Sequence, residues 1–330
     1  MQVAELLIDP SVLWANWDQI GQPLAFIDLD RCPEDVDIPV LPPVPLIGLG
    51  EDYHPLAARL DAIVEPPVSA ELLIRQIMAN PNAAAIMVQL LRGTEGLPPD
   101  RALVHESMCY GLLQGSDEHA QWMAAQTEQD APEMGPGTVH VDLKGDILHV
   151  VLDRPEARNA IDRVMRDALF EAFSLAAIDP EIRAIKLRAT GTSFSMGADL
   201  GEFGTTRDPA TAHLIRSYSL PAVPLARRPE ILDVHVQGPC VGSGLEIAAF
   251  AGRMTASAKA WFQLPELSMG IIPGAGGCVS VPRRIGRQRA ALMILSGKRI
   301  NALTALSWGL IDAIEDQPPA DDGGADQTGG

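Results

Sequence analysis

The chain has 330 residues, 47% of them hydrophobic and 21% charged, which is typical of a globular protein with ample material for a packed core. Its formal net charge of −18 argues against nucleic acids and anionic membrane surfaces as partners, because both are negatively charged. The four cysteines are widely spaced and form no C-x-x-C pair, so neither a zinc site nor a disulfide framework is predicted. The first residues lack the pattern of a signal peptide, and no apolar run has membrane-spanning length. We therefore expect a cytoplasmic protein without membrane insertion.

Residues 1–125 predict a small α/β or mainly helical domain of unknown role. Short apolar runs at 23–30 and 44–50 are separated by proline-rich segments, and the apolar spacing of 69–92 is typical of a helix pair. Gly48 and Gly50 suggest a nucleotide-binding turn, but no third glycine follows at the required spacing. The polar, proline- and glycine-rich segment 126–137 predicts a linker.

Strands and helices alternate after this linker, in the part of the chain from 138 to 315. Apolar and polar residues alternate on both sides of Gly145, which predicts a β-hairpin. Apolar residues at helical spacing predict a helix from Ile161 to Ala177 that ends before Pro180. Strands are predicted at 184–188 and 231–236, so the pattern favours βα repeats and a largely parallel core. The acidic, glycine-rich residues 316–330 predict a disordered tail.

Three glycine-containing turns, at 194–203, 240–250 and 270–277, each adjoin a predicted strand and lead into a predicted helix. Two such turns, brought together, can direct two backbone N–H groups at one oxygen and stabilise an oxyanion or enolate. Each turn alone is also consistent with ordinary packing. Each glutamate near these turns also has a purely structural interpretation. Glu246, at the start of the helix after the second turn, could be placed there because the helix dipole stabilises its charge, and Glu266 could be an exposed turn residue after Pro265.

Five motifs in the last two thirds of the chain resemble, in order, those of the enoyl-CoA hydratase/isomerase (crotonase) superfamily. "LDRPEARNAID" is similar to the segment that lies along coenzyme A, "FSMGADLGEF" to the F-x-x-G-A-D loop, and "CVGSGLEIAAF" to the G-G-G-x-E-L turn. "FQLPELSMGIIPGAGG" and "LSGKRINALTALSWGLI" resemble the two blocks that follow. The resemblance implies an α/β fold in which a spiral of ββα turns builds two roughly perpendicular sheets. It also implies a homo-oligomer, a trimer or hexamer, that binds an acyl-CoA thioester.

The resemblance implies two catalytic carboxylates, Glu246 and Glu266, which act on one water to hydrate a 2-enoyl-CoA. Two carboxylates close together in a partly dry pocket tend to hold different protonation states, as acid–base catalysis needs. The backbone N–H groups of Ala198 and Ser243 are the implied oxyanion donors, with Ser243 where the family has glycine. Neither a metal nor a cofactor is implied, since coenzyme A is part of the substrate. The implied substrate and coenzyme A contacts are Ala157, Arg158, Ala160, Met196, Gly197, Asp199, Gly242 and Gly274.

Other polar residues have weaker interpretations. Asp199 is expected to fix its loop rather than to transfer a proton, and the histidines at 140, 149 and 235 are expected to be structural. The basic residues of 283–299 form either a solvated face or a source of positive potential for a phosphate, to which Arg158 could contribute.

Two departures from the family accompany the resemblance. The family continues with helices that cover the acyl pocket, whereas here an acidic tail follows Glu315, and the first 125 residues have no counterpart in the simplest members. We hypothesise that the N-terminal domain occupies the space of the absent helices. Three classes of function stay open: a hydro-lyase, another crotonase-type reaction (isomerisation, thioester hydrolysis or decarboxylation), and a non-catalytic acyl-CoA-binding protein. The segment between Gly201 and Pro229 matches no motif, so no acyl chain length is predicted.

Overall fold

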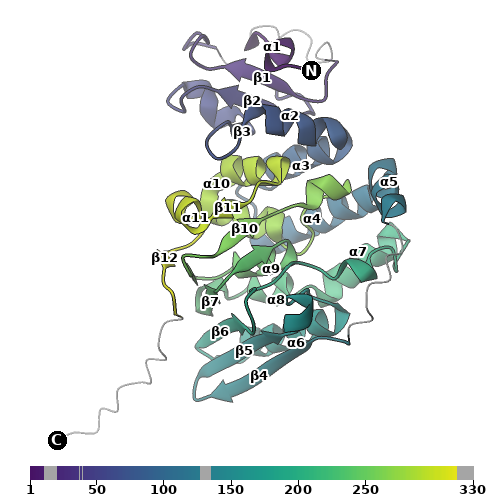
Figure 1. The fold of residues 1–330 in the computed structure, drawn as a ribbon, viewed down its shortest axis with the longest axis vertical. Coiled ribbons are helices and arrows are strands. Elements are labelled where there is room, and N and C mark those ends of the chain that lie inside the picture. Colours follow the sequence, from purple (N-terminus) through teal and green to yellow (C-terminus); the bar gives the residue numbers. More distant parts are fainter. Residues whose placement is uncertain (11–20, 37, 39, 127–134, 318–330) are drawn as a thin grey trace, which may run out of the picture.

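The computed structural model describes residues 1–10, 21–36, 38, 40–126 and 135–317 (Figure 1). Most of the predicted linker at 126–137 and of the predicted tail at 316–330 lies outside these residues. The N-terminal elements are α1 (Val3–Leu6), β1 (Ala25–Asp28), β2 (Leu46–Leu49), η3 (Pro55–Arg59), β3 (Ala62–Ile63), α2 (Ala70–Ala79), α3 (Pro81–Thr94), α4 (Pro99–Gln114) and α5 (Asp117–Ala125).

The elements that follow are β4 (Thr138–Lys144), β5 (Ile147–Asp153), η4 (Pro155–Ala157), α6 (Arg163–Ile178), β6 (Ala184–Ala189), η5 (Leu200–Glu202), α7 (Pro209–Ser219), α8 (Ala222–Leu225), η6 (Pro229–Ile231), β7 (Leu232–Val236), β8 (Pro239–Val241), α9 (Ser243–Ala248), β9 (Arg253–Ala256), β10 (Trp261–Gln263), η7 (Glu266–Met269), α10 (Gly277–Ser296), β11 (Ile300–Asn301), α11 (Ala302–Trp308) and β12 (Ala313–Ile314).

The N-terminal part combines a small parallel sheet with helices, which is the α/β form of the two alternatives predicted. The two apolar runs form β1 and β2, and β2 also pairs in parallel with β3. The predicted helix pair is α2 and α3. Ser69 begins α2, because its side chain accepts a hydrogen bond from the backbone N–H of Leu72, and Pro81 begins α3, where a missing N–H costs nothing.

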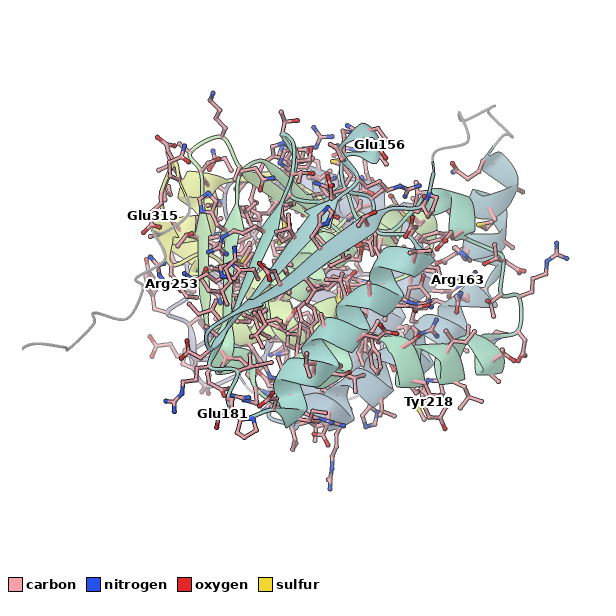
Figure 2. All side chains as sticks on the ribbon, turned by 90° about the horizontal axis from the view of Figure 1, so that it is seen from below. Glu156, Arg163, Glu181, Tyr218, Arg253 and Glu315 are labelled. Atoms are coloured by element: carbon pink, nitrogen blue, oxygen red, sulfur yellow. The ribbon has the colours of Figure 1, made fainter. Side chains whose placement is uncertain are left out.

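The larger sheet of residues 135–317 has six strands in the order β12-β9-β7-β6-β5-β4. The predicted hairpin is the antiparallel pair β4–β5, and β5, β6, β7, β9 and β12 pair in parallel. The predicted helix is α6, which Asp162 caps by accepting from the N–H of Met165 at 2.8 Å. Figure 2 shows Arg163 at the start of this helix, and Arg253 and Glu315 together at the far edge of the sheet, where they form an ion pair of 2.9 Å.

A three-stranded sheet, β11-β10-β8, lies between the six-stranded sheet and the N-terminal part (Figure 1). Helix α10 comes between β10 and β11 in the chain and packs against α2, α3 and α4, so it links the two parts of the chain. The helix bends at Gly286, whose φ of 79° lies in the region that favours glycine. None of the helices within the described ranges is long and apolar enough to cross a membrane.

Three of the four arginines in 283–289 hold the N-terminal part against α10, and the fourth, Arg284, bonds to Leu310 and Asp312. For these four residues the expectation of a solvated face or phosphate-binding cluster is wrong. Arg287 donates to the carbonyl oxygen of Leu60 at 3.1 Å, and Arg289 forms an ion pair with Glu65 at 2.7 Å. The side chain of Arg287 is only 9% exposed. These guanidinium groups are therefore committed to contacts within the chain. No local sequence pattern predicts these contacts, because acceptors such as Leu60 and Glu65 lie more than 200 residues away and include backbone carbonyls.

Candidate active site

The first two glycine turns lie against each other. A parallel bridge joins Ser195 to Cys240, and the N–H of Val241 donates to the carbonyl oxygen of Ser195 at 2.9 Å. Gly197 has a φ of 96°, and a Cβ at this residue would lie 3.3 Å from the carbonyl oxygen of Val241. Glycine is needed here both for the backbone conformation and for the close approach of the two turns.

This pairing leaves the N–H groups of Ala198 and Ser243 free to donate. Ile161 bonds to the residues on either side of Ala198: its N–H donates to Gly197 at 2.8 Å, and its carbonyl accepts from Asp199 at 3.0 Å. The N–H of Ala198 is not used in this bridge, and that of Ser243 belongs to the first turn of α9, where no intrahelical acceptor exists. Neither group donates to an acceptor within the described parts of the chain.

Glu246, on α9, is a buried carboxylate held by two backbone donors. The N–H groups of Ala275 and Gly277 both donate to its Oε2, at 2.6 and 2.8 Å. The residue is only 2% exposed. Burial raises the pKa of Glu246 to about 7, although the N–H groups of Gly277 and Ala275 oppose this rise by stabilising the anion.

Glu266, the first residue of η7, is a second buried carboxylate with fewer partners. Its Oε2 is buried and has no hydrogen-bond partner among the described residues. Burial and then the charge of Glu246 raise the pKa of Glu266 well above its ordinary value. Gly242, with a φ of 48°, lies beside it: a Cβ there would come within 2.7 Å of Glu266 Oε1. The second turn and Glu266 are therefore in close contact.

Both carboxylates and both candidate donors line one cavity of about 300 Å³. Of the predicted substrate contacts, five also line it: Met196, Gly197, Asp199, Gly242 and Gly274. The other three, Ala157, Arg158 and Ala160, are not among the residues that line it. Asp199 accepts from the guanidinium of Arg154 at 2.7 Å and from the N–H of Gly201 at 2.9 Å, contacts that tie its carboxylate to the loop. The histidines at 140, 149 and 235 lie on β4, β5 and β7, as predicted.

The structure places a third buried glutamate next to the site, which the sequence patterns did not predict. Glu106, on α4, is 1% exposed, and its two oxygens accept from the N–H groups of Gly276 at 2.7 Å and Cys278 at 2.8 Å. Burial, followed by the charge of Glu246, raises the pKa of Glu106 well above its ordinary value, although the N–H groups of Gly276 and Cys278 oppose this rise by stabilising the anion. The available signal was its place in the apolar stripe of a helix, between Leu103 and Leu113.

The same helix α4 supplies part of the cavity wall. Tyr110 lines the cavity and packs against Gly274, where a Cβ would lie 2.2 Å from the tyrosine ring. The guanidinium of Arg216, from α7, lies 4.6 Å from the centre of that ring and donates to Gln114 at 3.0 Å. The N-terminal part therefore contributes directly to the site.

Comparisons with known proteins identify the family that this chain resembles. The family model for enoyl-CoA hydratase/isomerase matches residues 142–319, more than half of the chain. The chain is 35% identical over 177 residues to the enoyl-CoA isomerase/hydratase fer4 of Mycosarcoma maydis, with 51% of this chain and 65% of that protein covered. It is 33% identical over 168 residues to the 2,3-dehydroadipyl-CoA hydratase of Escherichia coli, with the same two coverages.

A solved structure of an enoyl-CoA hydratase/isomerase from Marinobacter aquaeolei matches with a TM-score of 0.50 and 27% identity. The match covers 55% of this chain and 71% of that one. The chain therefore spans less than two thirds of the length of the two curated relatives and about seven tenths of the solved structure.

Proposed function

The chain belongs to the enoyl-CoA hydratase/isomerase family, and from this premise we propose that it adds water across the 2,3 double bond of a 2-enoyl-CoA thioester. The observation that carries the proposal is the pair of buried carboxylates, Glu246 and Glu266, in one cavity with unequal hydrogen bonding. Addition of water requires one group that removes a proton and one that supplies a proton, and such unequal surroundings separate these roles.

Glu246 is the base in this proposal. Two N–H donors stabilise its anion, and a pKa of about 7 leaves a substantial ionised fraction at neutral pH. Both donors bond to Oε2, and Oε1 accepts no hydrogen bond from the described residues, so Oε1 is the oxygen available to a water molecule. Glu266 is the acid, because its raised pKa and unpartnered Oε2 favour the protonated form.

The reaction then proceeds with a balanced transfer of atoms. Glu246 takes one proton from water, the oxygen of that water bonds to C3, and the π electrons move from C2=C3 to the thioester oxygen. The N–H groups of Ala198 and Ser243 donate to the enolate oxygen so formed, a type of contact whose loss costs about 2.7–4 kcal/mol per donor. The enolate takes a proton at C2 from Glu266. The proton now on Glu246 then passes to Glu266 through solvent, which restores the starting protonation state of each carboxylate.

The binding residues follow from the same arrangement. Met196, Gly197 and Gly242 bring the thioester to the two donors, and Tyr110 borders the cavity on the side of α4. The segment with Ala157, Arg158 and Ala160, of which Arg158 is exposed, is proposed to contact the coenzyme A moiety outside the cavity, as the family resemblance implies.

Variants of the two carboxylates test the proposal. Crotonyl-CoA and a longer 2-enoyl-CoA would be incubated with the wild type, Glu246→Gln and Glu266→Gln, following loss of the enoyl-thioester absorbance. We expect each variant to lower kcat by about 10²–10⁴-fold, the usual contribution of a general acid or base. Glu202→Gln is the matched control, because Glu202 lines the cavity but bonds to the N–H of Arg163, and it should retain activity.

Two results would contradict the proposal. One is a wild type that binds these thioesters without consuming the enoyl absorbance, which would favour a non-catalytic acyl-CoA-binding protein. The other is a Glu246 or Glu266 variant whose kcat stays within about threefold of the wild type, since a proton-transfer group contributes far more than that.

A further inference from the structure

Two glutamates from distant parts of the chain share the start of α10. The N–H groups of residues 275, 276, 277 and 278 donate in strict alternation, the first and third to Glu246 and the second and fourth to Glu106. Glu246 belongs to the segment that matches the family, whereas Glu106 comes from α4, before that segment. The first N–H groups of a helix have no intrahelical acceptor, so the two carboxylates complete the hydrogen bonding of this turn.

The two carboxylates bind the turn in different ways. Both donors to Glu246 reach the same oxygen, Oε2, whereas Glu106 uses Oε1 for Gly276 and Oε2 for Cys278. An amide in place of Glu246 can therefore keep both hydrogen bonds through one oxygen. An amide in place of Glu106 cannot, because its NH₂ group would face a second N–H donor.

The turn between the two carboxylates is packed and cannot easily shift alone. Gly276 has a φ of 107°, and a Cβ there would lie 2.6 Å from the ring of Phe250 and 2.8 Å from the Cβ of Ala222. Gly277 touches Glu246 itself, since a Cβ there would lie 2.6 Å from Glu246 Cγ. Glu106 does not line the cavity, and its hydrogen bonds to Gly276 and Cys278 connect it to the turn that holds Glu246.

We propose that Glu106 is a positioning residue of the active site: by holding the N–H groups of Gly276 and Cys278, it directs those of Ala275 and Gly277 onto Glu246 and so sets the orientation of that carboxylate toward the substrate. The effect of Glu106 on kcat, as predicted below, rests on the proposed hydration activity. The structural part of the proposal concerns the hydrogen bonds to Glu246 whatever the reaction is.

Three variants separate positioning from general stability. Glu106→Gln keeps the size of the side chain but places a donor against a donor. Glu106→Asp keeps both acceptor oxygens but withdraws them by about one bond length, roughly 1.5 Å. Ala102→Gly is the matched control: it weakens the same helix by about 1 kcal/mol at a buried position and removes no hydrogen bond to the turn.

The kinetic readout is the division between kcat and KM for 2-enoyl-CoA hydration. Glu106→Gln should lower kcat by about 100-fold, the cost of a small misplacement of a catalytic group, with KM within about threefold. Glu106→Asp should retain more activity than Glu106→Gln, and Ala102→Gly should retain the wild-type kcat. A wild-type kcat in Glu106→Gln, or an equal loss in Ala102→Gly, overturns the proposal.

The spectroscopic readout needs no activity. Amide protons that donate to a carboxylate resonate downfield, so the 15N-labelled wild type should show downfield amides for Ala275 and Gly277. In Glu106→Gln these two signals should move upfield, and if they keep their wild-type positions the proposal is refuted. If Glu106→Gln does not fold, the Ala275 and Gly277 amide signals are measured in Glu106→Asp instead, and unchanged positions there refute the proposal.

The two readouts also distinguish the proposals from each other. An inactive wild type whose Ala275 and Gly277 amides move in Glu106→Gln refutes hydration and supports the positioning role. An active wild type whose amides and kcat are unchanged in Glu106→Gln supports hydration and refutes the positioning role.

Discussion

Replacing Glu246 by glutamine should make the protein more stable at alkaline pH while leaving its structure unchanged. Glutamine has nearly the same shape, and one amide oxygen can accept from both Ala275 and Gly277, because both donors already converge on Oε2. The substitution therefore removes a titrating group from a buried site without removing its hydrogen bonds.

The magnitude follows from the raised pKa of Glu246, about 7 in the folded protein against an ordinary 4.5. Below pH 4.5 both the folded and the unfolded chain hold the proton, and the stability linked to this group is fully present. As pH rises toward 7 the unfolded chain ionises while the folded chain keeps its proton, so stability is progressively lost, and the loss is complete above the folded pKa. At about 1.4 kcal/mol per pH unit, the wild type loses about 3 kcal/mol that the glutamine variant does not lose.

The assay is urea unfolding of the wild type and Glu246→Gln at a series of pH values from 4.5 to 8.5. The free energy of unfolding of the variant, minus that of the wild type, should increase by about 3 kcal/mol across the series. Repeating the series at high salt is the control, because buried charges are screened much less than exposed ones. A difference that stays constant with pH would refute the reasoning, since it would mean that burial does not raise the pKa of Glu246.

Two further predictions concern the close approach of the turns and the role of the N-terminal part. Gly242→Ala should lower kcat by about 10²-fold or more, because the added Cβ meets Glu266 Oε1 and disturbs the adjacent oxyanion donor. Gly145→Ala is the control and should keep full activity, because Gly145 also has a positive φ but a Cβ there would have no atom within 4 Å. Full activity in both variants would contradict the prediction. Deleting residues 1–130 should abolish soluble, active protein, because it uncovers α10 and removes Glu106 and Tyr110. A soluble, fully assembled and fully active truncated protein in a sedimentation and activity assay would refute the idea that this part replaces helices of the family.

Sequence patterns predicted the parts of the fold and site whose signals are local. The hairpin around Gly145 and the helix of 163–178 follow from periodicity and turn residues within short windows. Glu246 and Glu266 could be placed in one pocket only because each lies in a motif that resembles the family, since nothing local to either residue indicates the other.

The contribution of α4 to the site could not be predicted from local patterns or from the resemblance to the family. Glu106 lies 170 residues before Gly276, and a single acidic residue in a helical apolar stripe does not identify its partners. The arginines of 283–289 were equally misleading, because a count of charges does not show that Leu60 and other backbone carbonyls would accept from them. In both cases the missing information is the packing of the N-terminal part on α10, a long-range contact that depends on the whole fold.

The most direct test of the central claim is the fate of the solvent oxygen. The wild-type protein would be incubated with crotonyl-CoA in water enriched in 18O, and the products analysed by mass spectrometry. Hydration predicts an intact 3-hydroxyacyl-CoA that carries one 18O atom at C3, with its formation strongly reduced in Glu246→Gln. Label found only in a free carboxylic acid, or an enoyl-CoA product without label, would contradict the account and favour thioester hydrolysis or isomerisation.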